Sequence, residues 1–70
     1  MKYDVEIEFL DEFGNVYDSH CVLLTDFLEE AERAAEKVEL HSPNEQAAIW
    51  EWDDSNSVVE DSWVVKRFAE

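Results

Sequence analysis

Basic residues, cysteine, glycine and proline are all scarce in this chain of 70 residues. Five lysine or arginine residues accompany nineteen aspartate or glutamate residues, which gives a formal net charge of −14. So few basic residues exclude a nucleic-acid-binding surface. The single cysteine, Cys21, excludes an internal disulfide framework and is typical of a reducing compartment. One glycine and one proline leave little sequence for linkers, so we expect residues 1–70 to form a single small acidic domain.

Long apolar runs are missing as well. No apolar stretch approaches the length of about 18 residues that a membrane span needs, and the chain opens in an alternating pattern without a basic and apolar leader. We therefore expect a cytoplasmic protein that does not contact membranes. Hydrophobic residues nevertheless make up 46% of the chain, and three of them are tryptophan. That content excludes a disordered acidic tail.

Four segments show the pattern of strands. Residues 3–9 alternate strictly between apolar and charged side chains, which predicts a half-buried strand. Gly14 and Asn15 then favour a turn, and a second strand is expected over residues 16–24, with Cys21 as a small core residue. A third strand is expected over residues 46–53, with Trp50 and Trp52 in the core. A fourth is expected over residues 58–68, with a bulge at residues 60–61 where the alternation loses phase.

One segment between the two pairs of strands shows the spacing of an amphipathic helix. Apolar residues recur every three or four positions from Phe27 to Val38. Asp26 and Glu29 have the spacing of a capping box, and the helix is expected to end near His41. The expected fold is therefore α+β: a two-layer arrangement of an antiparallel four-stranded sheet, in the order β-β-α-β-β, with one helix packed on one face.

The acidic residues fall into groups once this fold is assumed. The uncovered face of the sheet is expected to be an acidic plate made of Asp4, Glu6, Glu8, Asp18, Glu51 and Asp53. The outer face of the helix is expected to present Glu29, Glu30, Glu32 and Glu36. Further candidates for contact with a partner lie in or beside the last hairpin, and they are Asp54, Glu60, Asp61 and Trp63. Trp63 has a second interpretation as a core residue.

Catalytic and cofactor-binding patterns are weak. His20 and Cys21 are neighbours on an expected strand, so their side chains are expected on opposite faces. The segment of residues 53–57 begins like a calcium loop, but Val58 stands where that loop has glycine and Val64 where it has a bidentate glutamate. No glycine-rich phosphate-binding loop is present. We expect no enzymatic activity, no catalytic residues, no metal site and no cofactor.

The net charge is dense for so small a domain. A compact chain of this length is about 28 Å across, so fourteen net charges amount to about one per 2 Å, close to the one per about 1.7 Å of duplex DNA. Such a surface repels nucleic acids and attracts the proteins that bind them. Solubility alone needs a net charge of only about 2–8. Adaptation to high salt is another explanation.

In its size, its charge and its layout of hairpin, helix and hairpin, the chain resembles small acidic phage-encoded proteins that disarm host defence, including anti-CRISPR proteins and DNA-mimicking anti-restriction proteins. The resemblance extends over the whole chain and includes the acidic stretches of residues 4–8 and 29–36. It implies an inhibitor in the host cytoplasm whose partner is a basic nucleic-acid-binding protein or nuclease complex, with no direct contact to nucleic acid. The alternative is a non-catalytic protein–protein interaction module or homodimer, in which the acidity serves solubility.

Overall fold

A computed structural model describes residues 1–55 and 57–68 of the chain. Within these residues the elements follow the order β1 (Lys2–Leu10), β2 (Val16–Thr25), α1 (Leu28–Lys37), β3 (Glu45–Trp52) and β4 (Val59–Arg67). The strands form one antiparallel sheet in the order β2-β1-β3-β4, which leaves β2 and β4 at the edges. The predicted α+β fold is confirmed.

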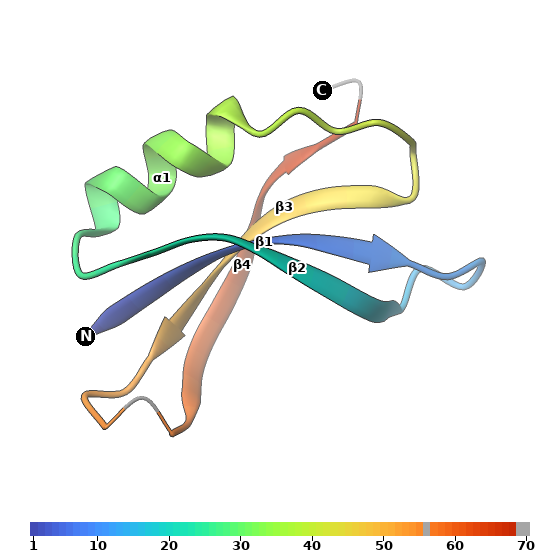
Figure 1. The fold of residues 1–70 in the computed structure, drawn as a ribbon. Helices are drawn as coiled ribbons and strands as arrows, with labels where there is room; N and C mark the ends of the chain where they lie inside the picture. The colour runs from blue at the N-terminus through green and yellow to red at the C-terminus, as the bar shows by residue number, and fades with distance from the viewer. Residues whose placement is uncertain (56, 69–70) are drawn as a thin grey trace.

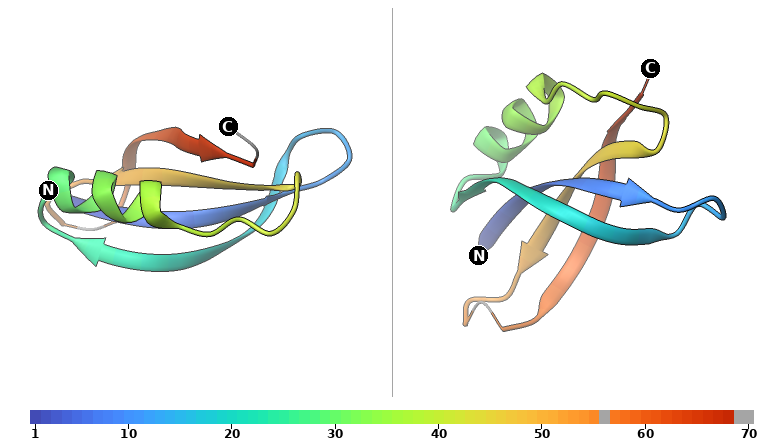
Figure 2. Two further views of the ribbon diagram at one scale, coloured as in Figure 1. Left: turned by 90° about the horizontal axis from the view of Figure 1, so that it is seen from above. Right: turned by 45° about the vertical axis from the view of Figure 1, so that its right-hand side comes forward.

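The helix lies on one face of a strongly twisted sheet (Figures 1 and 2). The β1–β2 hairpin and the β3–β4 hairpin extend away from the helix in different directions. The core between the two layers is formed by small helix residues and branched strand residues. Ala31 and Ala35 are fully buried against Val5, Ala47 and Ile49. Because alanine carries only a methyl group, the helix axis can approach the sheet closely, and the larger strand side chains fill the remaining space.

The two faces of the sheet differ in chemistry because side chains alternate along each strand. On β1, Tyr3, Val5 and Ile7 face the helix, so Asp4, Glu6 and Glu8 face the other side, which we call the open sheet face. Residues paired across an antiparallel ladder point to the same face. Trp50 pairs with Asp4, and Trp52 pairs with Lys2.

The predicted placement of Trp50 and Trp52 in the core beneath the helix is therefore wrong. Both tryptophans are half-buried on the open sheet face, and Ala47 and Ile49 occupy the core positions of β3. Residues 47–50 are all apolar, so the sequence of this central strand does not show which alternate residues face the helix.

The helix is shorter than the expected range of residues 26–41. Its N-cap is Phe27, without a side-chain capping bond, and Asp26 instead forms an ion pair with Lys2. At the other end, Lys66 on β4 donates hydrogen bonds of 3.1 Å and 2.6 Å to the backbone carbonyls of Glu36 and Val38. These bonds satisfy carbonyl groups that have no partner within the helix. In the described part of the chain, no helix has the length and apolar character needed to cross a membrane.

Both edge strands are irregular. On β2, Val22 and Tyr17 have no partner in the pairing with β1. At each of these positions the alternation of side chains between the two sheet faces shifts by one residue. Cys21 consequently pairs with Glu6 on the open sheet face, and its predicted role as a buried core residue is wrong. On β4, the pairing skips Glu60, which confirms the predicted bulge. The turn between β1 and β2 contains Gly14 at φ +82°, a conformation that glycine adopts readily.

Candidate functional site

Three carboxylates lie in a row along β1 on the open sheet face. We call Asp4, Glu6 and Glu8 the carboxylate row. Their exposed fractions are only 8%, 4% and 8%. The predicted acidic plate is therefore wrong in its main part, because these side chains share a face, as expected, but are shielded from solvent. Burial of a charged group is costly unless hydrogen bonds or an opposite charge compensate it.

Two side chains of β3 donate hydrogen bonds to Glu8. The amide Nε2 of Gln46 lies 2.8 Å from Oε1, and the indole Nε1 of Trp50 lies 2.9 Å from Oε2. Because Trp50 pairs with Asp4 but reaches Glu8, its side chain must extend along the sheet past the level of Glu6. Both oxygens of Glu8 are thus satisfied by neutral N–H donors, which offset part of the cost of its burial.

Asp4 has weaker donors. The indole Nε1 of Trp52 lies 3.3 Å from Oδ2, and the thiol Sγ of Cys21 lies 3.1 Å from Oδ1. A thiol is a poor hydrogen-bond donor, and 3.3 Å is long for an N–H···O bond. Asp4 therefore receives less compensation for its burial than Glu8 does.

Glu6 lies between these two carboxylates. Burial, together with a hydrogen bond and charge repulsion from Asp4, raises the pKa of Glu6 to about 7. Burial and the adjacent Asp4 also raise the pKa of the Cys21 thiol to about 12. Ligand atoms of Asp4, Glu6 and Cys21 lie within 4.8 Å of one another. Metal binding would have to displace the protons that this environment retains, so the geometry alone does not make this group a metal centre.

No cation of the described chain neutralises the carboxylate row. The ion pairs within 4.0 Å in this part of the chain join Lys2 to Asp26 and the N-terminal ammonium to Asp54. The second pair raises the pKa of the N-terminus, chiefly through its hydrogen bond to Asp54. Among the described residues, the carboxylate row is therefore surrounded by neutral donors and has no cation within 4.0 Å.

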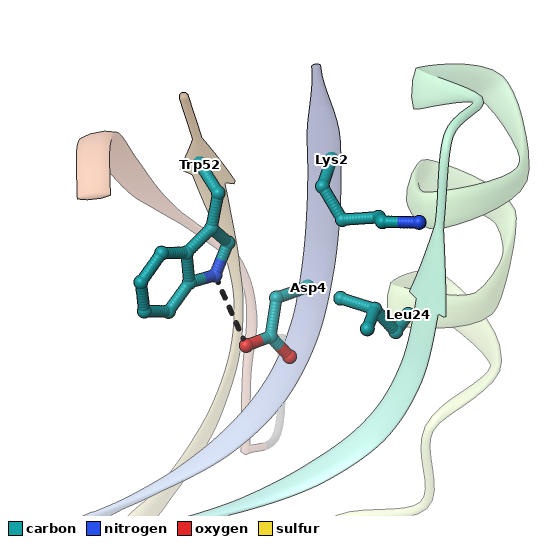
Figure 3. A pocket seen from close by; sticks show the side chains of 4 residues that line it. All are labelled: Lys2, Asp4, Leu24 and Trp52. Atoms are coloured by element: carbon teal, nitrogen blue, oxygen red, sulfur yellow. Dashed lines mark hydrogen bonds between the residues drawn. The ribbon is translucent and has the colours of Figure 1, made fainter. Parts of the chain in front are cut away.

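A cavity of about 240 Å³ opens beside Asp4, and we call it the Trp52 cavity. Its lining residues are Lys2, Asp4, Leu24 and Trp52. Figure 3 shows the Trp52 indole and Leu24 on opposite sides of the Asp4 carboxylate, with the Lys2 side chain directed away from Trp52. The ammonium of Lys2 is held 3.2 Å from Asp26. The cavity thus combines the apolar walls of Trp52 and Leu24 with one carboxylate and with the side chain of Lys2, whose ammonium is paired with Asp26.

Among the described elements, α1 carries the most exposed acidic residues. All four predicted glutamates are exposed, and we call Glu29, Glu30, Glu32 and Glu36 the acidic helix face. Three of them, Glu29, Glu32 and Glu36, line one shallow groove together with Arg33. Among the described residues, Arg33 forms no ion pair within 4.0 Å. The predicted helix surface is therefore brought together as expected.

The other candidate residues are dispersed. Asp18 pairs with Phe9 and Glu51 with Tyr3, so the register puts both on the helix side of the sheet, away from the carboxylate row. Asp54, Glu60 and Asp61 are exposed around the β3–β4 hairpin. Trp63 packs against the helix-side core, which agrees with its core interpretation and not with an exposed position.

Asp53 folds the turn after β3. Its carboxylate accepts hydrogen bonds from the backbone N–H groups of Ser57 and Val58 and from the Ser55 hydroxyl. These bonds, with that of Ser57 the largest influence, hold the pKa of Asp53 below its usual value. Its observed contacts are those of a turn-forming residue, and it is not part of an acidic plate.

The sequence interpretation missed Leu24 and the roles of Trp50 and Trp52 as hydrogen-bond donors. The sequence does contain one signal for these roles. Trp50 and Trp52 fall on one expected strand, and three alternate carboxylates fall on another, so the two groups could face each other across the sheet. Comparison with protein-family models, curated proteins and solved structures finds no match to this chain.

Proposed function

We propose that the protein is an acidic binding inhibitor that mimics nucleic acid and occupies a basic DNA- or RNA-binding surface of a host-defence complex, such as a CRISPR effector or a restriction enzyme. The observation that carries this proposal is the acidic helix face, where exposed glutamates are concentrated on one rigid element. The carboxylate row is shielded from solvent, so the helix is the better candidate for the first electrostatic contact.

The spacing of the helix carboxylates supports this role. Glu29, Glu32 and Glu36 are separated by three and four residues, so they follow one side of the helix at intervals of about 4.5 and 6 Å along its axis. One strand of duplex DNA carries a phosphate about every 3.4 Å. The two linear charge densities are within a factor of about two, and long-range attraction of this kind accelerates association with a basic surface.

The direct test is competition for a nucleic-acid-binding surface. Purified CRISPR effector and restriction-enzyme complexes are titrated with the protein, with and without a DNA or guide-RNA competitor. We expect binding that excludes the competitor and weakens at least tenfold between 50 and 200 mM salt. The triple variant Glu29→Gln, Glu32→Gln and Glu36→Gln should lower the association rate about tenfold.

The matched control carries the same loss of charge elsewhere. Asp18→Asn, Glu60→Gln and Asp61→Asn alter three exposed carboxylates on the edge strands. This variant should retain most of the association rate. A complex that tolerates both salt and competitor, or that responds equally to both triple variants, would contradict nucleic-acid mimicry by the helix.

A second candidate function is that of an interaction module that adds an edge strand to a partner or to a second copy. The observation in its favour is the edge strand β2, where Val16, Tyr17, Val22 and Leu24 are all exposed. Proline at Val22 should then abolish binding or dimer formation, as measured by analytical ultracentrifugation, while the helix variants leave it intact.

A further inference from the structure

The Trp52 cavity lies beside a buried carboxylate that no described cation of the protein neutralises. We propose that this cavity binds the guanidinium group of an arginine side chain of the partner protein. The inference rests on the proposed function for the nature of the partner, since a nucleic-acid-binding surface is rich in arginine. It adds a specific contact to the long-range attraction of the helix.

The charge balance of the cavity favours a cation. Only 8% of the surface of Asp4 is exposed. Its partners are the Trp52 indole, the Cys21 thiol and the neighbouring Glu6 carboxyl group, none of which is a cation. The nearby ammonium of Lys2 is engaged by Asp26. A carboxylate offers about four acceptor positions, and three are engaged by Trp52, Cys21 and Glu6, so Asp4 retains capacity for a further hydrogen bond. A guanidinium can supply two parallel N–H donors to one carboxylate.

The walls of the cavity favour a flat cation. Trp52 provides an indole, the aromatic group that attracts cations most strongly, and Leu24 provides an apolar wall across from it. A guanidinium is planar and weakly hydrated, so it stacks on aromatic rings more readily than an ammonium does. Anions are excluded because the Asp4 carboxylate repels them.

The size of the cavity fits one side chain. Its volume of about 240 Å³ is below the range of about 300–1,000 Å³ typical of pockets for whole small molecules. The cavity also lies at the end of the sheet where β2 leads toward the helix, and the ion pair of Lys2 with Asp26 connects it to that end of α1. A basic surface that approaches the helix is therefore close to the cavity.

Binding can be measured without the partner by two-dimensional ¹H–¹⁵N NMR of the isolated protein. The probe is N-acetyl-L-arginine amide, and the reporter is the indole N–H of Trp52, which donates to Asp4. We expect a saturable shift of this signal with a dissociation constant on the order of 1 mM. The indole signals of Trp50, which donates to Glu8, and Trp63, in the helix-side core, are internal references.

Two probe controls separate charge from shape. N-acetyl-L-citrulline amide retains the shape of the arginine derivative without its charge and should cause no saturable shift. N-acetyl-L-lysine amide should bind at least threefold more weakly, because an ammonium is more strongly hydrated and cannot stack. Equal binding of the citrulline or lysine derivative would overturn the assignment to a guanidinium.

Protein variants locate the site. Asp4→Asn should weaken binding at least tenfold, because it removes the charged acceptor. If that variant does not fold, Leu24→Lys is the second test, since it places an internal cation at an exposed position on the cavity wall. Val22→Lys adds the same charge at another exposed position of β2 and should leave binding within twofold.

The outcomes also separate this inference from the proposed function. A Trp52 signal that stays unchanged, or that shifts equally in the Leu24→Lys variant, overturns the arginine site, even if the acidic helix face proves necessary for inhibition. Saturable binding that Leu24→Lys abolishes supports the site. Failure of the protein to compete with nucleic acid on any basic target would then count against the proposed function alone.

Discussion

Trp50 donates its indole N–H to Glu8 although its partner in the strand ladder is Asp4. The bond of 2.9 Å therefore crosses the sheet diagonally and extends an aromatic side chain over the middle of the carboxylate row. This relationship explains how acidic side chains become buried on a face that no helix covers.

The first prediction concerns this hydrogen bond. Trp50→Phe retains an aromatic ring but removes the donor, which leaves Glu8 with Gln46 as its remaining side-chain donor. We expect a loss of about 1–3 kcal/mol in the free energy of unfolding, measured by urea denaturation. In a background of Glu8→Gln the same substitution should cost less, because the acceptor is no longer charged. Equal costs in both backgrounds would contradict the assigned bond.

The second prediction concerns pH. The folded protein raises the pKa of Glu6 from 4.5 to about 7, chiefly through burial, so between these values the folded state binds more protons than the unfolded state. The contribution of Glu6 to stability is thus fully present below pH 4.5 and is lost as the pH rises toward and through 7.

Urea midpoints measured between pH 5 and pH 8 test this. Wild-type protein should lose stability across that interval, and Glu6→Gln, which cannot titrate, should show a flatter profile. The exposed variant Glu30→Gln is the matched control and should retain the wild-type slope. If wild type and Glu6→Gln have the same slope, Glu6 is not the group that titrates.

The sequence predicted the fold well, because the strict alternation of β1 and the helix spacing of residues 27–38 each have one simple interpretation. It predicted the acidic helix face for the same reason. The carboxylate row differs because its burial depends on tryptophans from another strand, and residues 47–50 are apolar on both faces. Side-chain cover across strands is a tertiary property that alternation within one strand does not encode.

The third prediction concerns Cys21. Cys21 as a residue is exposed, but desolvation of its thiol, together with the hydrogen bond to Asp4 and the charge of Asp4, raises the pKa of the thiol to about 12. Very little thiolate therefore exists near neutral pH. At pH 8 we expect 5,5′-dithiobis(2-nitrobenzoic acid) to react with the folded protein at least tenfold more slowly than with the urea-unfolded chain. Asp4→Asn should accelerate the reaction, whereas Glu30→Gln should leave it unchanged. A folded protein that reacts as fast as the unfolded chain would contradict this prediction.

The fourth prediction concerns repulsion on the helix. Glu32 and Glu36 are both exposed and separated by four residues, an arrangement that destabilises a helix. Glu36→Lys replaces this repulsion with attraction and should raise the free energy of unfolding by about 0.5–1 kcal/mol at 20 mM salt. The gain should shrink at 500 mM salt because both charges are exposed. A gain that persists unchanged in high salt would indicate a cause other than charge.

The hydrogen bonds from Lys66 to the end of α1 can form only after most of the chain has been synthesised. The carbonyl groups of Glu36 and Val38 accept hydrogen bonds from the ammonium of Lys66, which lies 30 and 28 positions later in the chain. On the ribosome, the helix therefore emerges before the strand that closes its final turn. Until Lys66 has left the ribosome, the last turn of the helix lacks this ammonium and is expected to fray.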